Sequence, residues 1–300
     1  MGALALDAAG VNGLPPSRSA ALLWPLLAHF RAGEARLSQW ASRRPLRAAF
    51  YEFARFGVKQ AWACLFGAIM LSLLMATHVF YPLAAPLARY DFLALAALAA
   101  QAAMLAGRLE TWEEAKVIFL FHLVGTGMEV FKTATGSWVY PEPSLLRLGG
   151  VPLFTGFMYA SVGSFIARDW RLLHFRFARH PPLWVVYGLA LAIYGNFFLD
   201  HWRVDLRWLL LAAAVAIFAR TTIYYRVWRV DRRMPMLIAN ILTAGFLWVG
   251  ENVGTFARAW AYPAQAHGWR LVGFSKFSSW FLLLIVSYAL VAAVNRPGRL

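Results

Sequence analysis

Long apolar stretches separated by short polar segments recur along the chain from about residue 60 to its end. A helix needs about 20 mostly apolar residues to cross the hydrocarbon core of a bilayer. The pattern therefore predicts an all-α fold, a polytopic membrane bundle of about eight transmembrane helices. The expected spans are Ala61–Tyr81, Tyr90–Gly107, Ala115–Phe131, Val151–Ala167, Leu183–Leu199, Trp208–Tyr225, Met236–Gly254 and Phe274–Val294.

The amino-terminal segment has a different pattern. From Ser19 to Arg55, apolar residues mix with arginines, which is typical of an amphipathic helix that lies in the membrane interface. Met1–Gly13 lacks the basic start and long apolar core of an export signal, so we expect this terminus to be retained. The predicted organisation is a basic interfacial segment over 1–55, a first membrane repeat over 56–180 and a second over 181–300.

Composition supports a membrane protein. The chain is 61% hydrophobic, 16% aromatic and 14% charged, which excludes both an ordinary soluble globule and a disordered chain. A net charge of +15 could indicate nucleic-acid binding. Lys and Arg lie mostly in short segments between apolar runs, however, where contacts with lipid headgroups and the orientation of the spans explain them. The lone Cys64 can neither close an internal disulfide nor complete a Cys-based metal site.

The distribution of basic residues predicts the orientation. With a cytoplasmic amino terminus, 21 Lys and Arg fall on the cytoplasmic side and 8 on the other, so both termini are expected inside, in the bacterial cytoplasmic membrane. Two arginine groups are interpreted as cytoplasmic loops, namely Arg168, Arg171, Arg176 and Arg179, and Arg220, Arg226, Arg229, Arg232 and Arg233. Glu110, Glu113 and Glu114 are interpreted as a solvated acidic loop held by Arg108 and Lys116.

An internal repeat links the two halves of the chain. The stretch from Glu129 recurs from Glu251, with an offset of 122 that becomes 123 further on. Each copy would hold four spans and enter the membrane in the same direction, so the halves would be related by an axis along the membrane normal. The matching residues are Glu129, Thr133, Trp138, Tyr140 and Pro141 with Glu251, Thr255, Trp260, Tyr262 and Pro263, then Arg147, Gly150 and Phe154 with Arg270, Gly273 and Phe277.

The two repeated acids are the leading site candidates. A carboxyl group near hydrocarbon costs a few kcal/mol unless it is protonated, paired or facing a wet cavity. The orientation above places Glu129 and Glu251 at the outer ends of their spans, beside a shared pocket. His122 lies on the same helical face as Glu129, about 10 Å away along the axis, and could line the same cavity. The aromatic residues of the repeat are interpreted first as interface anchors.

A second polar cluster ends the fifth predicted span, with Asn196, Asp200, His201 and Asp205. Together with His122 these residues could bind a metal, but their spacing matches no structural zinc pattern, so no metal is predicted. Neither a phosphate-binding Gly-rich loop nor a nucleophile elbow is persuasive, so no cofactor is predicted either.

Several short sequence segments match those of a known family. They are Arg89–Leu93, Phe121–Thr126, Met128–Lys132, Gly136–Trp138, Tyr140–Glu142, Val151–Phe154, Gly156–Tyr159, Asn196–Phe198, Glu251–Asn252 and Trp260–Pro263. From about Phe56 to Val294 the chain resembles an uncharacterised bacterial integral membrane family, domain of unknown function 817. The resemblance implies an integral membrane protein and assigns no activity.

A weaker, partial resemblance covers Glu129–Pro152. An acid late in a span, an aromatic loop and a Gly-Val-Pro turn are similar to the carotenoid hydratase and lycopene cyclase membrane families. That resemblance implies acid chemistry on long isoprenoid chains, with aromatic faces that stabilise positive charge. The chain departs from those families at Leu153 and Phe154, where a Glu pair would follow the turn.

Three hypotheses follow. The protein is a membrane enzyme that acts on an apolar lipid or isoprenoid, a transporter that uses the same glutamates as proton or cation sites, or a scaffold in which they pair with Lys132, Arg258 or Asn196. The expected partners are the lipid bilayer and an apolar small molecule, with no nucleic acid and an open oligomeric state. The candidate catalytic residues are Glu129, Glu251, His122 and Asp200, and the candidate substrate-binding residues are Trp138, Tyr140, Trp260, Tyr262, Asn196, Thr133 and Thr255.

Overall fold

The computed structural model describes residues 33–82, 84–199, 205–295 and 297–299. Its contacts divide the chain into two units, Met1–Gly57 and Val58–Leu300. In the first unit, residues 33–42 are helical and α3 (Pro45–Ala63) begins. Arg55 pairs with Glu34 there, and Phe50 and Phe53 are exposed. The interfacial helix stays a prediction, and residues 19–32 of it lie outside the described residues.

The described residues of the second unit form eight α-helices from α4 on, and each overlaps one predicted span. The capping box that Thr111 and Glu114 form at the start of α6 satisfies two backbone N–H groups. The helices are α4 (Leu65–Phe80), α5 (Arg89–Ala106), α6 (Trp112–Ala134), α7 (Phe154–Leu173), α8 (Leu183–Leu199), α9 (Arg207–Phe218), α10 (Met236–Phe256) and α11 (Ser275–Val294).

Three of these helices, α6, α10 and α11, are long and apolar enough to cross a membrane by themselves. The bent pair α3 and α4 passes the same test together, whereas α8 and α9 are shorter apolar helices. The chain is therefore a membrane protein built mainly from helices. The count of eight spans stays a prediction, because length and composition alone support three or four crossings in the described residues.

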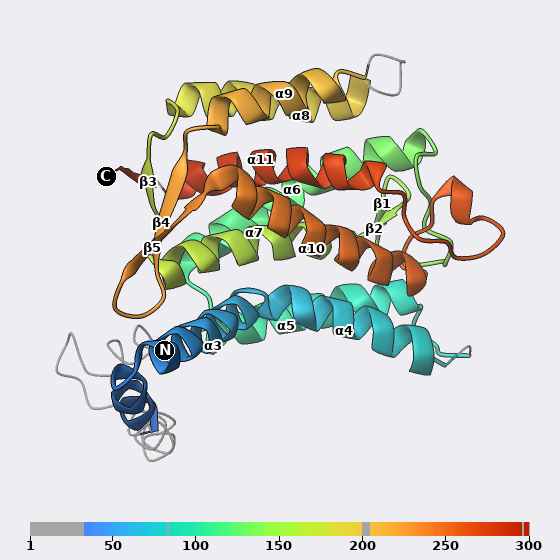
Figure 1. The fold of residues 1–300 in the computed structure, drawn as a ribbon. Helices are drawn as coiled ribbons and strands as arrows, with labels where there is room; N and C mark the ends of the chain where they lie inside the picture. The colour runs from blue at the N-terminus through green and yellow to red at the C-terminus, as the bar shows by residue number, and fades with distance from the viewer. Residues whose placement is uncertain (1–32, 83, 200–204, 296, 300) are drawn as a thin grey trace. The chain divides into compact units, whose positions relative to one another are not determined.

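The all-α prediction needs a correction, because short strands lie at both ends of the helices (Figure 1). At one end β1 (Arg147–Leu148) pairs with β2 (Val151–Pro152). At the other end the described residues form a sheet with the order β5-β4-β3-β6. Its strands are β3 (Arg176–Ala178), β4 (Thr222–Arg226), β5 (Asp231–Pro235) and β6 (Gly298–Arg299).

The predicted span Trp208–Tyr225 is wrong at its carboxyl end. Helix α9 ends at Phe218, and Thr222–Arg226 forms the first strand of an antiparallel hairpin. Its Thr-Ile-Tyr-Tyr run is rich in β-branched and aromatic residues, which favour strands. An apolar run alone did not distinguish helix from strand here.

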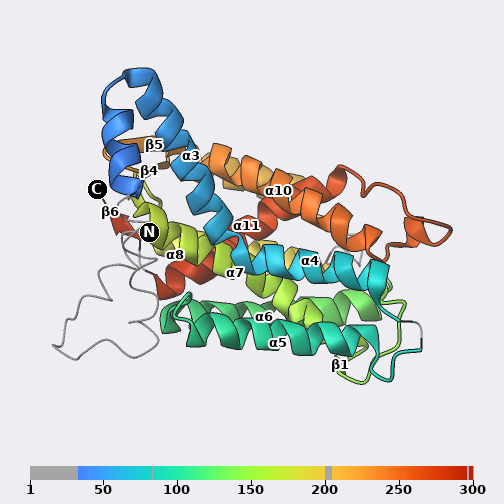
Figure 2. The same ribbon diagram turned by 90° about the horizontal axis from the view of Figure 1, so that it is seen from below.

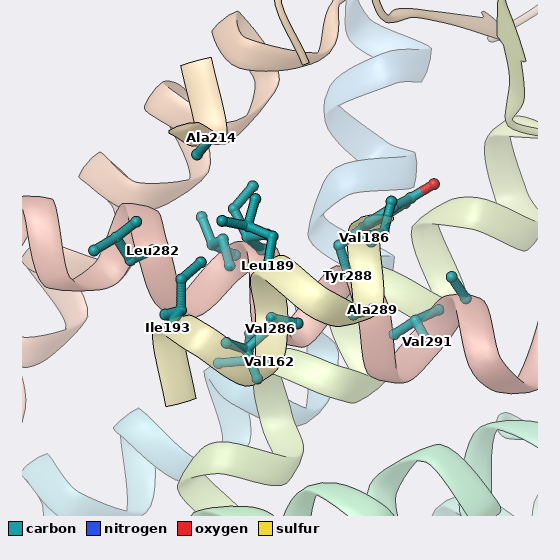
Figure 3. Close-up of a cluster of buried hydrophobic side chains, with 14 of the residues drawn as sticks. Val162, Val186, Leu189, Ile193, Ala214, Leu282, Val286, Tyr288, Ala289 and Val291 are labelled. Carbon is teal, nitrogen blue, oxygen red and sulfur yellow. The ribbon is translucent and has the colours of Figure 1, made fainter. Parts of the chain in front are cut away.

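Helix α11 lies at the centre of the second unit, in contact with α6, α7, α8, α9 and α10. Figure 3 shows side chains of this core, among them Val186, Leu189, Leu282 and Val291, which are all buried. On the other side of the unit, α4 contacts α5, α7 and α10, as Figure 2 shows from below. The interior between these two helix groups is where the candidate site lies.

A buried ion pair ties α7 to the segment between α5 and α6. Both side chains of the Arg168–Glu110 pair are fully buried, with a distance of 2.7 Å between Nη2 and Oε1. Ser164 Oγ also donates to Glu110 Oε1 at 2.8 Å, and Gln101 Nε2 donates to the other carboxylate oxygen. Two charges withdrawn from solvent are stable only when they are paired and hydrogen-bonded in this way.

This cluster corrects the interpretation of the 110–114 segment as a solvated acidic loop. Glu114 is buried as well and accepts a hydrogen bond from Arg171 Nε at 3.0 Å. Only Glu113 pairs on the surface, with Lys116. Arg168, which was interpreted as a charge of a cytoplasmic loop, is likewise fully buried. Spacing along the chain could not show that α7 brings its arginines to these glutamates.

We expect Arg168→Ala to lower the free energy of unfolding by about 3–5 kcal/mol, because it leaves a buried carboxylate without its cation. Thermal unfolding in detergent, followed by circular dichroism, measures the effect. Lys116→Ala at the exposed pair is the control and should change the melting temperature little. The double variant Glu110→Gln, Arg168→Met should recover most of the loss. Equal melting temperatures for Arg168→Ala and Lys116→Ala would contradict this account.

Candidate functional site

Glu129, near the carboxyl end of α6, is 4% exposed and accepts three hydrogen bonds. Its Oε2 accepts one from Trp138 Nε1 at 2.7 Å and one from the Tyr140 hydroxyl at 2.5 Å. Its Oε1 accepts a third from the Tyr159 hydroxyl at 2.6 Å. A carboxyl group away from water needs such partners to offset its desolvation.

Glu251, near the carboxyl end of α10, is 6% exposed and has the equivalent aromatic partners. Trp260 Nε1 donates to Glu251 Oε1 at 3.0 Å, and the Tyr262 hydroxyl donates to the same oxygen. In each half, the two donors lie nine and eleven residues after the acid. The repeated motif thus makes the same local hydrogen bonds twice.

The two aromatic loops also pair with each other. Val139 and Ala261, the central residues of the two Trp-x-Tyr motifs, form an antiparallel bridge with both N–H···O distances at 2.9 Å. The Trp138 and Tyr262 rings meet edge to face at 6.1 Å. Lys276 Nζ lies over both rings, 4.3 Å from the Tyr262 centroid and 5.2 Å from the Trp138 centroid. These contacts bring the acids of both halves to one place.

The start of α5 anchors the first loop. Asp91 is buried, and its two carboxylate oxygens accept hydrogen bonds from the backbone N–H groups of Leu145 and Leu146, each at 2.8 Å. Hydrogen bonds to a charged acceptor are among the stronger ones in proteins. Asp91 therefore fixes the segment that leads from the aromatic loop into α7.

The two residues before Asp91 anchor the second loop. The Tyr90 hydroxyl donates to the carbonyl of Arg258 at 3.0 Å, and Arg89 Nη2 donates to the carbonyl of Ala257 at 2.7 Å. Arg89 also pairs with Glu142 of the first loop at 2.5 Å. The Arg89–Asp91 segment thus holds both loops from one helix end. The sequence analysis names this segment only for its family resemblance and predicts no contact between it and the loops.

The loop tyrosines remain donors over the ordinary pH range. Burial, followed by the adjacent charge of Glu129, raises the pKa of Tyr140 well above its usual value of 10. Burial and the charge of Glu251 raise the pKa of Tyr262 in the same way. Each hydroxyl therefore keeps the proton that it donates to its glutamate.

A cavity of about 350 Å³ contains both glutamates. Its polar end is lined by the aromatic loops together with Lys132, Lys276 and Arg207. Away from the glutamates the wall is mostly apolar and comes from α4, α7, α10 and α11, with Leu71, Met158, Val162, Phe165, Phe246, Leu247 and Leu283 among its side chains. A cavity of this kind can hold a molecule with an apolar body and one polar end.

Six of the predicted site residues line this cavity: Glu129, Glu251, Trp138, Tyr140, Trp260 and Tyr262. The roles assigned to them remain predictions. Tyr159 was missed, although it contacts Glu129 directly. A Cβ atom on Gly125 would lie 2.7 Å from Cγ of Tyr159, so α6 needs a glycine there for the tyrosine to reach the acid. No repeat signal marks Tyr159, because Leu282 stands at the matching position.

Other predicted site residues lie elsewhere in the described part of the chain. The His122 ring packs edge to face against Phe157 at 4.3 Å, and it is not among the residues that line the cavity. Asn196 Oδ1 accepts a hydrogen bond from the backbone N–H of Leu206 at 2.8 Å, and its Nδ2 donates to Asp205. Asn196 therefore links the end of α8 to the residues just before α9.

The two repeated threonines follow the acids by about one helical turn. Thr255 Oγ1 donates to backbone carbonyls of α10 and accepts a hydrogen bond from Trp269 Nε1 at 3.2 Å. Thr133 Oγ1 is buried and has no hydrogen-bond partner among the described residues. Neither lines the described cavity wall. Asp200 and His201 lie outside the described residues, and within those residues no cluster of three His, Cys, Asp or Glu could hold a metal.

Comparison with known proteins gives a family and a fold likeness. The family described as a protein of unknown function (DUF817) matches residues 52–288, which confirms the resemblance noted in the sequence. The uncharacterized protein YoaT of Bacillus subtilis (strain 168) is 42% identical over 248 residues, which cover 83% of this chain and 93% of the relative.

Two solved structures are similar at low identity. The mycobacterial Insig homolog MvINS from Mycobacterium vanbaalenii shows 17% identity and a TM-score of 0.45, covering 63% of this chain and 97% of its own. A cross-linked trimer of MvINS gives 16% identity and a TM-score of 0.43, with the same coverage. The similarity to the carotenoid hydratase and lycopene cyclase families stays a prediction.

We expect Asp91→Ala to lower the free energy of unfolding by about 2–4 kcal/mol, because two backbone N–H groups lose a charged acceptor. The loop before α7 should also become more sensitive to protease, which mass spectrometry of the fragments can locate. Glu113→Ala, at an exposed acid, serves as the control. A variant with unchanged melting temperature and unchanged cleavage would show that Asp91 does not anchor the loop.

Proposed function

Because the chain belongs to the DUF817 family, whose description assigns no activity, we propose from the site itself that it is a membrane enzyme acting on an apolar molecule. The substrate is a lipid of isoprenoid type, bound with its polar or unsaturated end at Glu129 and Glu251. The observation that carries this proposal is the shared cavity, which combines two buried acids and aromatic faces with a largely apolar wall.

The hydrogen bonds suggest different roles for the two acids. Glu129 accepts hydrogen bonds on both oxygens, so the protein's own aromatic donors occupy them. Both aromatic donors to Glu251 reach Oε1, so Oε2 is the oxygen better placed for a ligand. In the proposed reaction the O–H bond of Glu251 breaks, and the π electrons of a substrate double bond form a new C–H bond to that proton. The indole and phenol faces stabilise the cation. Loss of a neighbouring proton to the Glu251 carboxylate then gives a rearranged alkene and restores the acid.

The proposal includes a parallel duplication of the membrane part, with four spans in each half. Equal spacing of acid and donors in α6 and α10, and the pairing of Val139 with Ala261, support it. The excess of basic residues supports cytoplasmic termini. The match to a Bacillus subtilis protein supports a bacterial cytoplasmic membrane.

Transport by the same glutamates is less well supported. A path for a polar solute would need polar groups beyond the acids, whereas the cavity wall there is mostly apolar. The scaffold hypothesis expected the glutamates to pair with Lys132, Arg258 or Asn196. The hydrogen bonds to both acids instead come from aromatic side chains that line a cavity.

The test compares lipid extracts of a deletion strain complemented with wild type, Glu251→Gln or Glu129→Gln, with Glu113→Gln as the matched exposed control. We expect both cavity variants, and not the control, to accumulate one apolar species that wild type converts. Glu251→Gln removes the proton that is transferred, and Glu129→Gln replaces one oxygen that accepts the aromatic donors with a donor group. Mass spectrometry of whole-membrane lipids and of lipids bound to purified protein provides the readout.

Identical lipid profiles in all four strains would overturn the enzyme proposal. If profiles stay identical while Glu129→Gln and Glu251→Gln abolish solute flux in proteoliposomes, the transporter hypothesis replaces it. If both variants only lower the melting temperature, the glutamates are structural.

A further inference from the structure

Two residues on different helices line the cavity and are also exposed on the outside of the second unit. Phe246 on α10 lines the cavity wall and is 58% exposed. Ala68 on α4 lines the same wall and is exposed as well. Among the described residues that line the cavity, these two are the exposed ones. The cavity wall is therefore thin along the seam of α4 and α10, which contact each other, and an opening to the surface fits there.

The opening faces the part of the protein that would meet lipid chains. Phe246 lies at the middle of α10, a helix that is long and apolar enough to span a membrane. In the most apolar window of α10 only 22% of residues are buried, against 56% for α11. Its outer face carries Ile238, Leu242 and Val249, which are exposed. At this depth the surroundings are hydrocarbon rather than headgroups or water.

Small residues leave room between the two helices. Gly67 and Gly250 both line the cavity, on α4 and α10 respectively. A Cβ atom on Gly250 would be 3.9 Å from Cδ1 of Leu71 on α4. At this point of the seam the Leu71 side chain therefore packs against bare backbone of α10, at ordinary contact distance. A larger side chain at this seam would fill the passage.

We propose that this opening is a lateral portal through which a single hydrocarbon chain passes from the bilayer into the cavity, with Ala68 and Phe246 setting the width of chain admitted. The inference rests on the proposed function, because it supplies the route for an apolar substrate. It also specifies the substrate class further: the molecule resides in the membrane, and its polar end must be small enough to reach Glu129 and Glu251 through an apolar seam.

The experiment uses a cysteine inside the cavity as the reporter. Cys64→Ser removes the native thiol, and Ser279→Cys, a near-isosteric change, places one in the cavity wall on α11. The protein in phosphatidylcholine and phosphatidylglycerol vesicles is treated with N-dodecylmaleimide or with a charged, membrane-impermeant maleimide. Labelling is followed by intact-mass spectrometry. We expect the alkyl reagent to react much faster, because it partitions into the bilayer.

Ala68→Trp in this background should slow alkyl labelling by about tenfold or more, because a close-packed indole leaves no space for the chain. Phe246→Ala should accelerate it. Leu242→Trp is the matched control, since Leu242 is exposed on α10 but is not among the described cavity residues. It should leave the rate unchanged. Melting temperatures show that each variant is folded.

Equal rates in Ala68→Trp and Leu242→Trp would overturn the portal, as would faster reaction with the charged reagent, which would place the entrance at the loop end. If Ala68→Trp fails to fold, an unchanged rate in Phe246→Ala refutes the proposal and an increased rate supports it. The labelling needs no natural substrate. A portal confirmed here together with unchanged cellular lipids would therefore separate the route from the proposed chemistry.

Discussion

Two carboxyl groups buried in an apolar interior are the constraint on which the rest of this site depends. Neither Glu129 nor Glu251 could stay there without donors, because desolvation of an unpaired acid costs several kcal/mol. Tyr159 donates from α7, but the other four donors come from loops outside the helices, so the loops must fold back over the helix ends. Their mutual pairing at Val139 and Ala261 and their attachment to the start of α5 follow from that need.

The same constraint applies at the opposite end of the helices. Glu110 and Arg168 are withdrawn from solvent together and satisfy each other with help from Ser164. One end of the unit is thus held by a compact ion pair, and the other by aromatic donors around acids that line a cavity. An acid whose partner is a fully charged arginine is a structural element. The proposed function uses the other kind, an acid held by neutral donors beside a cavity.

Periodicity located the helices well because an apolar run of about 20 residues leaves few alternatives in a membrane chain. It failed where the run was short, since the end of α9 and the start of β4 are both apolar. Helical-face arguments could not show the surroundings of His122, whose ring packs against Phe157 and is not among the residues that line the cavity. The sequence also could not show that the Asn196 amide oxygen accepts a hydrogen bond from the backbone N–H of Leu206.

The sequence alone determined that this is a helical membrane protein of the DUF817 family with one motif present twice, because composition, hydropathy and repeat register are properties of the chain itself. Only the tertiary structure decided that both copies meet at one cavity and that Tyr159 joins Glu129. It alone decided too that Arg168 is an internal counterion, and that the cavity wall is thin along the seam of α4 and α10. Those features depend on which helices become neighbours. Local sequence patterns do not predict contacts between segments that are far apart in the chain.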